Sequence, residues 1–133
     1  READKDILPW CNSHDITFLA YSPLSQGILT GKIKNENSFK GDDIRIGNPR
    51  FSQSNIELVN EILNKKIRPI ANQKCISLTQ LIIAWITSHK NMVALCGARN
   101  AKQAAENSGA GDILLSQEEI LSISNLFESA KIR

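Results

Sequence analysis

Residues 92–107 read MVALCGARNAKQAAEN, and this stretch carries the clearest structural signal in the chain. Met92 to Cys96 is a short apolar run that predicts a strand, and Gly97 ends it. Asn100 is a residue type that caps helices, so a helix is expected to follow. A strand that leads through a glycine turn into a helix is the repeating unit of α/β proteins.

A second strand-to-loop junction lies near the start of the chain. Residues 16–20 form another short apolar run with several β-favouring side chains, and the run stops at Tyr21-Ser22-Pro23. This pattern predicts a buried strand that ends in a loop. Over residues 22–54 the composition shifts to Gly, Ser, Asn, Asp and Pro, which predicts a long loop of the kind that often carries function.

Helical patterns surround and separate the two expected strands. Ser77 with Gln80 and Ser116 with Glu119 have the form of capping boxes, in which side chains satisfy the N–H groups left open at a helix start. Pro69 is expected to bend or end the helix before it. Helices are predicted over residues 4–14, 55–67 and 77–89, from residue 100 onward and from residue 116 onward.

Strands separated by helices imply parallel pairing and an α/β fold. Two strands cannot form a sheet that is covered on both faces, so the chain is expected to be an incomplete barrel or sheet. The opening Arg1-Glu2-Ala3-Asp4 has no initiating Met and no signal segment after it, and it reads like the interior of a longer protein. The open strand edge and uncovered apolar face predict that the isolated chain is unstable as a monomer, so that self-association, a missing partner chain or partial disorder should result.

Composition narrows the class of protein. The 133 residues are 41% hydrophobic and 23% charged, which is the balance of an ordinary globular protein. The 16 basic and 14 acidic residues are interspersed, so no nucleic-acid-binding surface is expected. The longest apolar run, residues 81–86, is far shorter than the roughly 20 residues that span a bilayer, so no membrane partner is expected.

Cysteine and histidine residues give no sign of a disulfide framework or a metal site. Cys11, Cys75 and Cys96 are odd in number, widely spaced and form no Cys-x-x-Cys pair, which fits a protein of the reducing cytoplasm. Cys96 is expected to be a buried strand residue. His14 and His89 fall at the expected ends of helices, where an imidazole typically caps the last turn.

Chemistry is expected at the two strand ends, because ligands of parallel α/β proteins bind at the carboxyl ends of strands. Small residues after the first strand let backbone N–H groups approach a phosphate, and Lys32 adds a point charge. After the second strand, Arg99 adds a guanidinium at the positive end of a helix. Gln103, Glu106 and Asn107 are spaced to face one ligand. Together, the two strand ends and the helix that follows the second one predict a nucleotide site, although polar residues on one helix face are usually only solvated.

Several segments resemble the aldo-keto reductase family, in the family's order. Residues 8–32, with the turn Tyr21-Ser22-Pro23-Leu24 and the pair Gly31-Lys32, resemble its seventh-strand region. Further similar pieces are Asn48-Pro49-Arg50-Phe51, Pro69-Ile70-Ala71, residues 78–85, and the Gly97-Ala98-Arg99-Asn100 turn of the eighth-strand cofactor signature. The resemblance implies that residues 1–133 are the C-terminal part of a single (β/α)8 TIM barrel domain, whose N-terminal half is absent from this chain.

The resemblance also implies roles for individual residues around NADPH. Tyr21 would stack on the nicotinamide ring rather than simply line a core. The pyrophosphate would be held by Ser22, Pro23, Leu24, Gln26 and Lys32, and it would be covered from the long loop by Arg45 or Arg50. The adenosine 2′-phosphate would meet Gly97 and Arg99, and the adenine and its ribose would be reached by Gln103, Glu106 and Asn107.

The family's catalytic residues have no counterpart in this chain. The resemblance implies an Asp, a Tyr acid, a Lys and usually a His from earlier strands, whereas Tyr21 is the only tyrosine here and has a different place in the pattern. The segment alone is therefore expected to be inactive, and to supply the cofactor pocket of a complete protein that reduces small aldehydes or ketones with NADPH. Two alternatives stay open: a non-catalytic nucleotide-binding or regulatory protein that resembles potassium-channel β subunits, and a structural or interaction fragment.

Overall fold

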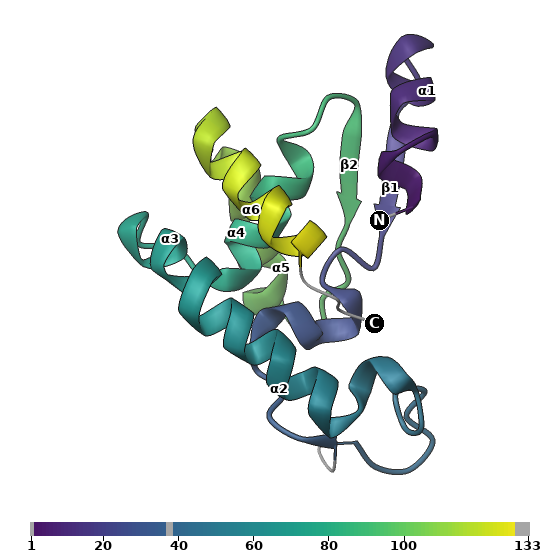
Figure 1. Cartoon of the computed structure of the whole chain (residues 1–133), viewed down its shortest axis with the longest axis vertical. Helices are drawn as coiled ribbons and strands as arrows, with labels where there is room; N and C mark the ends of the chain where they lie inside the picture. The colour runs from purple at the N-terminus through teal and green to yellow at the C-terminus, as the bar shows by residue number, and fades with distance from the viewer. Residues whose placement is uncertain (1, 37–38, 130–133) are drawn as a thin grey trace.

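The computed structural model describes residues 2–36 and 39–129, in which two strands alternate with helices (Figure 1). The main elements are α1 (Ile7–Ser13), β1 (Phe18–Tyr21), α2 (Gln53–Ile62), α3 (Arg68–Gln73), α4 (Leu78–Thr87), β2 (Met92–Leu95), α5 (Ala101–Ser108) and α6 (Gln117–Ser129). Short 3-10 helices cover Glu2–Asp4, Ser25–Thr30, Pro49–Phe51 and Gly109–Asp112, and a π-helical turn covers Leu63–Ile67. The predicted alternation of helices and strands is confirmed.

β1 and β2 pair in parallel, as the sequence predicts, with Phe18 opposite Met92. They are the only two strands in the part of the chain that the structure describes. β1 begins two residues later than the predicted run, because the N–H of Ile16 donates to the carbonyl oxygen of Cys11 at 2.9 Å. Ile16 therefore still belongs to the turn that follows α1.

One face of this two-stranded sheet is uncovered. Its side chains are between 45% and 82% exposed: Leu19, Tyr21, Val93 and Leu95. On the opposite face Ala20, Met92 and Ala94 pack against the core. The prediction of a buried first strand is therefore wrong for one of its faces, because the helices of the described residues cover only the other one.

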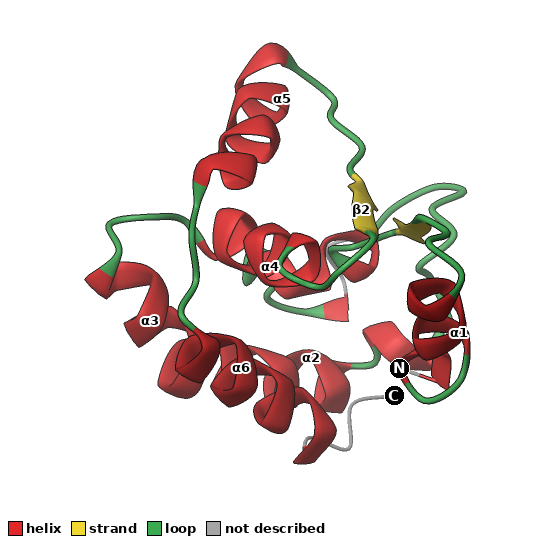
Figure 2. Ribbon diagram, turned by 90° about the horizontal axis from the view of Figure 1, so that it is seen from above, coloured by secondary structure: helices red, strands yellow, loops and turns green. Residues whose placement is uncertain are grey.

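α4 lies at the centre of the molecule, between the strands and a row formed by α2, α3 and α6 (Figure 2). Leu81 and Ile82 of α4 are both 0% exposed. The helix begins with the predicted capping box, in which Ser77 Oγ accepts the N–H of Gln80 and Gln80 Oε1 accepts the N–H of Ser77, both at 3.1 Å. The box sets the first residue of α4 and therefore which side chains face the core.

The helix predicted over residues 55–67 is longer and divided. α2 ends at Ile62, the chain widens into a π-helical turn, and α3 carries the helical path on to Gln73. Pro69 has no N–H to donate to the carbonyl four residues earlier, so a regular α-helix cannot run through it. The predicted interruption next to Pro69 is confirmed, and the helical path continues beyond Ile67, the last residue of the predicted range.

The segment over residues 22–54 is not one open loop, and that prediction is corrected. Its described residues include the 3-10 helices Ser25–Thr30 and Pro49–Phe51, and α2 already begins at Gln53. Ile33, Phe39 and Phe51 are 9%, 9% and 2% exposed, and the two phenylalanine rings pack edge to face at 5.4 Å. Burial of these apolar side chains fixes the segment against the core despite its polar composition. Residues 37–38 of the segment lie outside the described residues.

α5 and α6 begin at the residues that the sequence marks as caps. Asn100 Oδ1 accepts the N–H of Gln103 at 2.9 Å. Before α6, the N–H of Ser116 donates to Glu119 Oε2 at 2.7 Å and the N–H of Glu119 donates to Ser116 Oγ at 3.2 Å. Both predicted caps are confirmed, and the second places Ile123 of α6 fully inside the core.

Candidate functional site

A cavity of about 500 Å³ opens where the carboxyl ends of β1 and β2 meet α5. This is the edge of a parallel sheet at which ligands of α/β proteins bind. Most of the residues named from the sequence line it: Ser22, Pro23, Leu24, Gln26, Lys32, Arg45, Gly97, Arg99, Gln103, Glu106 and Asn107. The structure thus brings together two segments that are far apart in the sequence.

The chain turns sharply after β1, where it forms one wall of the cavity. Ser22, Ser25 and Gln26 have φ angles of 49°, 46° and 55°, and Gly27 has 97°. These are left-handed conformations that residues other than glycine rarely adopt. The N–H of Ser25 donates to the carbonyl oxygen of Ser22 at 2.7 Å, which closes the turn. Backbone strain of this kind persists only where the surrounding structure enforces it, and it is concentrated at ligand sites.

The opposite wall is the turn between β2 and α5, which side chains of α5 hold in place. Gln103 Oε1 accepts the backbone N–H of Arg99 at 2.8 Å, and Asn107 Nδ2 donates to the carbonyl oxygen of Gly97 at 3.1 Å. Gln103 and Asn107 are one helical turn apart, so both reach back over the same side of the helix start. The position of the Arg99 backbone is therefore fixed by α5.

α5 has an inverted distribution of polar and apolar residues. Its half-buried residues are Gln103, Glu106 and Asn107, whereas Ala104 and Ala105 are exposed and no residue of the helix is fully buried. Ser77 Oγ donates to Glu106 Oε1 at 2.6 Å, which joins α5 to the start of α4. A helix that packs on protein normally turns its apolar face inward, so the polar face of α5 suits a polar ligand.

The cavity wall carries three cationic side chains and one carboxylate: Lys32, Arg45, Arg99 and Glu106. Arg45 is the most constrained of the four, since its guanidinium forms an ion pair with Asp43. That hydrogen-bonded pair raises the pKa of the Arg45 guanidinium and lowers the pKa of Asp43 to about 2. An excess of positive charge beside the positive end of a helix favours an anionic ligand.

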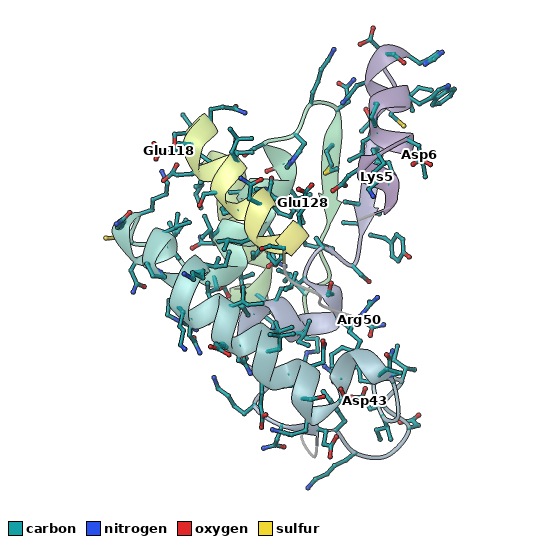
Figure 3. The ribbon with its side chains drawn as sticks, in the orientation of Figure 1. Lys5, Asp6, Asp43, Arg50, Glu118 and Glu128 are labelled. Carbon is teal, nitrogen blue, oxygen red and sulfur yellow. The ribbon has the colours of Figure 1, made fainter. Side chains whose placement is uncertain are left out.

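Two residues named from the sequence do not line the cavity. Tyr21 is 82% exposed on the uncovered face of the sheet. Arg50 is exposed and lies beside the segment that carries Asp43 (Figure 3). It sits in the 3-10 helix Pro49–Phe51, where burial of Phe51 directs the preceding side chain outward. Of the two loop arginines left open by the sequence, the structure brings only Arg45 to the cavity.

Two threonines also lie in the cavity wall, although the site patterns in the sequence do not include them. Thr30 Oγ1 donates to the carbonyl oxygen of Gly27 at 2.7 Å and accepts the N–H of Lys32 at 3.2 Å. Thr79 is 5% exposed and follows the cap of α4. The capping box gave the only signal for Thr79, because it places the first turn of α4 but does not show what that turn faces.

The remaining reactive side chains have structural positions. His14 and His89 lie at the ends of α1 and α4, with Nδ1 at 2.9 Å and 2.8 Å from carbonyl oxygens of the preceding turn, so the predicted caps are confirmed. Cys96 follows β2 and is half-buried, which corrects its prediction as a buried strand residue. Burial raises the pKa of the Cys96 thiol, which disfavours the nucleophilic thiolate.

Residues 2–36 and 39–129 were compared with the requirements of a metal site and of a membrane-spanning helix. These residues contain no group of three or more His, Cys, Asp or Glu side chains placed to hold a metal ion. None of the helices in this part of the chain has the length and apolar character needed to cross a membrane.

Comparison with known proteins gives a consistent set of relatives. The model of the Aldo/keto reductase family matches residues 1–128. Aldo-keto reductase str7 of Strobilurus tenacellus is 30% identical over 118 residues, which cover 88% of this chain and 35% of that protein. The Schizosaccharomyces pombe aldo-keto reductase yakc, whose name includes NADP(+), is 29% identical over 127 residues, which cover 95% of this chain and 37% of that protein.

The fold agrees with a solved structure as well. Glycerol dehydrogenase AKR11B4 from Gluconobacter oxydans superposes with a TM-score of 0.87 and 27% sequence identity. The superposition covers 100% of this chain and 40% of that chain. The chain therefore spans well under half the length of the relatives that it matches.

Proposed function

The chain belongs to the aldo/keto reductase family, and from that membership we propose that it is the cofactor-binding part of an oxidoreductase that reduces aldehydes or ketones with NADPH. We infer that β1 and β2 are the last two strands of a (β/α)8 barrel, since the segments around them resemble the seventh- and eighth-strand regions of the family and the chain covers 40% of the glycerol dehydrogenase. The other strands would then cover the exposed face that carries Leu19 and Val93.

The observation that carries the proposal is the polar inner face of α5. The side chains on this face are only half-buried, so their amide and carboxylate groups can be reached by a ligand. Gln103, Glu106 and Asn107 already contact backbone or side-chain groups around the cavity, which holds their remaining polar atoms along its wall. An adenine ring and a ribose supply donors and acceptors that suit such a wall.

The volume and the charge of the cavity support a nucleotide as its ligand. Its volume of about 500 Å³ lies within the range of roughly 300 to 1,000 Å³ that is usual for ligand sites. Arg99 lies beside the N-terminus of α5, where it would bind the 2′-phosphate together with the backbone at Gly97. Lys32 and Arg45 line the part of the cavity formed by the turn after β1, where they would hold the pyrophosphate with Ser22, Pro23, Leu24 and Gln26.

The nicotinamide end would lie at the exposed sheet face. Tyr21 ends β1 at the carboxyl edge of the sheet, where ligands of barrel proteins bind, so its ring would stack on the nicotinamide there. NADPH bound there supplies a hydride to a carbonyl carbon, and a proton donor completes the alcohol. Tyr21 is the only tyrosine of this chain, so the Tyr acid that the resemblance to the family implies would come from outside these residues. The chain orients the cofactor, and the rest of the protein completes the site.

Cofactor titration of the protein in its native length tests the proposal. NADPH should bind with a change in its fluorescence, and it should be consumed when an aldehyde is added. The 133-residue chain alone should not consume NADPH when an aldehyde is added, whichever function the native protein has. Lack of NADPH binding by the native protein would contradict the proposal, and binding without turnover of any aldehyde or ketone would favour the non-catalytic alternative.

A further inference from the structure

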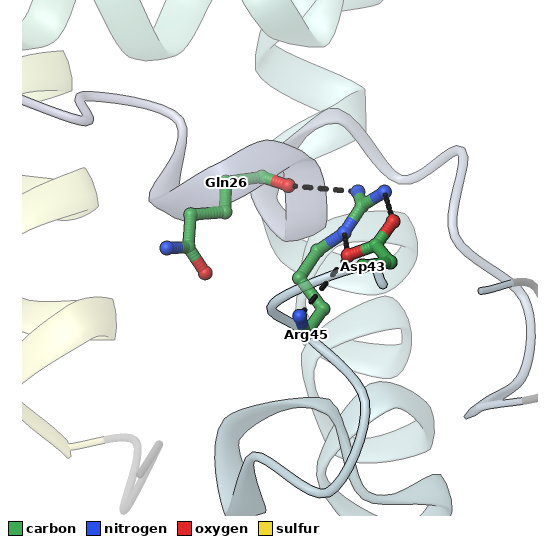
Figure 4. Close-up of polar contacts among 3 residues, drawn as sticks. All are labelled: Gln26, Asp43 and Arg45. Atoms are coloured by element: carbon green, nitrogen blue, oxygen red, sulfur yellow. Dashed lines mark hydrogen bonds and ion pairs between the residues drawn. The ribbon is translucent and has the colours of Figure 1, made fainter. Parts of the chain in front are cut away.

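The guanidinium of Arg45 is held on two sides by polar contacts (Figure 4). Its Nε donates to Asp43 Oδ1 at 2.8 Å and its Nη2 donates to Asp43 Oδ2 at 2.5 Å, so the ion pair is bidentate. Its Nη1 donates to the backbone carbonyl oxygen of Gln26 at 3.2 Å. Arg45 thus bridges the long segment before α2 and the strained turn after β1.

An aromatic ring fixes the plane of the same guanidinium. The Arg45 Cζ lies 4.2 Å from the centre of the Phe39 ring, which is buried against Phe51. The ring provides a cation–π contact and blocks one face of the guanidinium. With contacts at its edge, at one end and on one face, the side chain has little remaining rotational freedom.

The segment that carries Arg45 is also tied to α2. The N–H of Glu36 donates to Gln53 Oε1 at 3.3 Å, and the N–H of Gln53 donates to Glu36 Oε2 at 3.2 Å. Asn60 Nδ2 donates to the carbonyl oxygen of Ile33 at 2.8 Å. These contacts anchor the segment at Ile33 and Glu36, and the buried Phe39 anchors it nearer to Arg45.

We propose that Asp43 is a positioning residue, which holds Arg45 in the cavity wall with donors available for the anionic part of a dinucleotide. A guanidinium has five N–H bonds, of which the contacts with Asp43 and Gln26 use three. Among the contacts of the described residues the other two N–H bonds are not used, so they remain for a ligand. The inference rests on the proposed function, since it names the residue that prepares Arg45 for the pyrophosphate of NADPH.

Asp43 itself lies outside the cavity lining. Both of its carboxylate oxygens are used by Arg45, and Oδ1 also accepts the backbone N–H of Arg45 at 3.0 Å. With its pKa lowered to about 2, the carboxylate is charged at neutral pH. Asp43 therefore acts on a ligand through Arg45 and not by direct contact.

A double-mutant cycle on NADPH affinity tests the inference. Asp43→Ala should raise the Kd about 10-fold, the scale set by the rotamer freedom that an arginine loses when it is ordered. The same change made in an Arg45→Met background should have no further effect, because there is no guanidinium left to position. Asp42→Ala is the matched control, since it removes an adjacent exposed carboxylate outside the cavity lining.

A second measurement tests the positioning role of Asp43 without NADPH. The Nε–H resonance of Arg45 in the ligand-free protein should report a rigid side chain, and Asp43→Ala should make it mobile while that of Arg68 is unchanged. Equal rigidity in the variant would overturn the positioning role. Tighter NADPH binding by Asp43→Ala would also overturn it, because Asp43 would then compete with the ligand. Failure of the wild-type protein to bind NADPH would contradict the proposed function alone.

Discussion

Arg99→Ala should separate the two nicotinamide cofactors. Arg99 lines the cavity immediately before the cap of α5, and its backbone N–H is already bonded to Gln103 at 2.8 Å. Truncation of the side chain therefore removes the guanidinium but leaves the hydrogen bond that shapes the turn. NADPH has a 2′-phosphate for this guanidinium to bind, and NADH has none.

The size of the effect follows from the type of contact. A hydrogen bond between charged groups contributes about 1.5 to 3 kcal/mol, so the Kd for NADPH should rise about 10-fold to 150-fold. The eight-residue helix α5 keeps its positive end beside the phosphate, so the lower part of this range is expected. The Kd for NADH should change less than about 3-fold, within the scatter of exposed substitutions.

Fluorescence titration with both cofactors measures the two constants on the same variant. Lys102→Ala is a suitable control, because Lys102 is exposed on α5 and does not line the cavity. Lys102→Ala removes one positive charge from α5 but no contact with the ligand. Comparing the two variants therefore separates loss of the phosphate contact from loss of long-range electrostatic attraction. Equal losses for NADPH and NADH in Arg99→Ala, or none, would mean that Arg99 does not bind the phosphate.

Three further predictions concern the fold. Ser116→Ala should lower the free energy of unfolding in urea by about 1 kcal/mol through loss of its cap. Ser77→Ala should lower it further, because Ser77 caps α4 and also donates to Glu106, and equal losses would contradict this. The charged Asp43 carboxylate should stabilise the wild type above pH 3.8, and this stability should be lost as the pH falls through the folded pKa of about 2. Asp43→Asn should lack this pH-dependent stability, so parallel pH profiles of Tm for the two proteins would refute the prediction. The isolated chain should self-associate through the uncovered sheet face, and Leu19→Lys should shift it toward monomer in sedimentation, whereas an unchanged distribution would place the contact elsewhere.

The starts of the helices could be predicted from the sequence because they depend on short-range hydrogen bonds. Ser77, Asn100 and Ser116 each bond to an N–H three residues later, as the capping patterns predict. The polar face of α5 follows from the spacing of Gln103, Glu106 and Asn107 in the same way. Features that depend on three or four neighbouring residues are visible in the sequence without any knowledge of the fold.

The features that the sequence could not reveal depend on distant partners. Asp43 and Arg45 are close in sequence, yet nothing local shows that Arg45 reaches Gln26, which is 19 residues away. Composition predicts a loop over residues 22–54 because it does not show that Phe39 packs against Phe51. Likewise, an apolar strand is expected to be buried on both faces, and the exposure of Leu19 depends on how many strands the sheet contains.

The residues that start the helices also build the cavity, which links folding to binding. Ser77 caps α4 and at the same time donates to Glu106 in the cavity wall. Gln103 receives the cap of Asn100 at its N–H and holds the Arg99 backbone with its side chain. Because these side chains serve both purposes, the geometry of the wall is set when α4 and α5 form. A ligand therefore meets a prepared surface, and the ordering cost that usually opposes binding has been met largely by the fold.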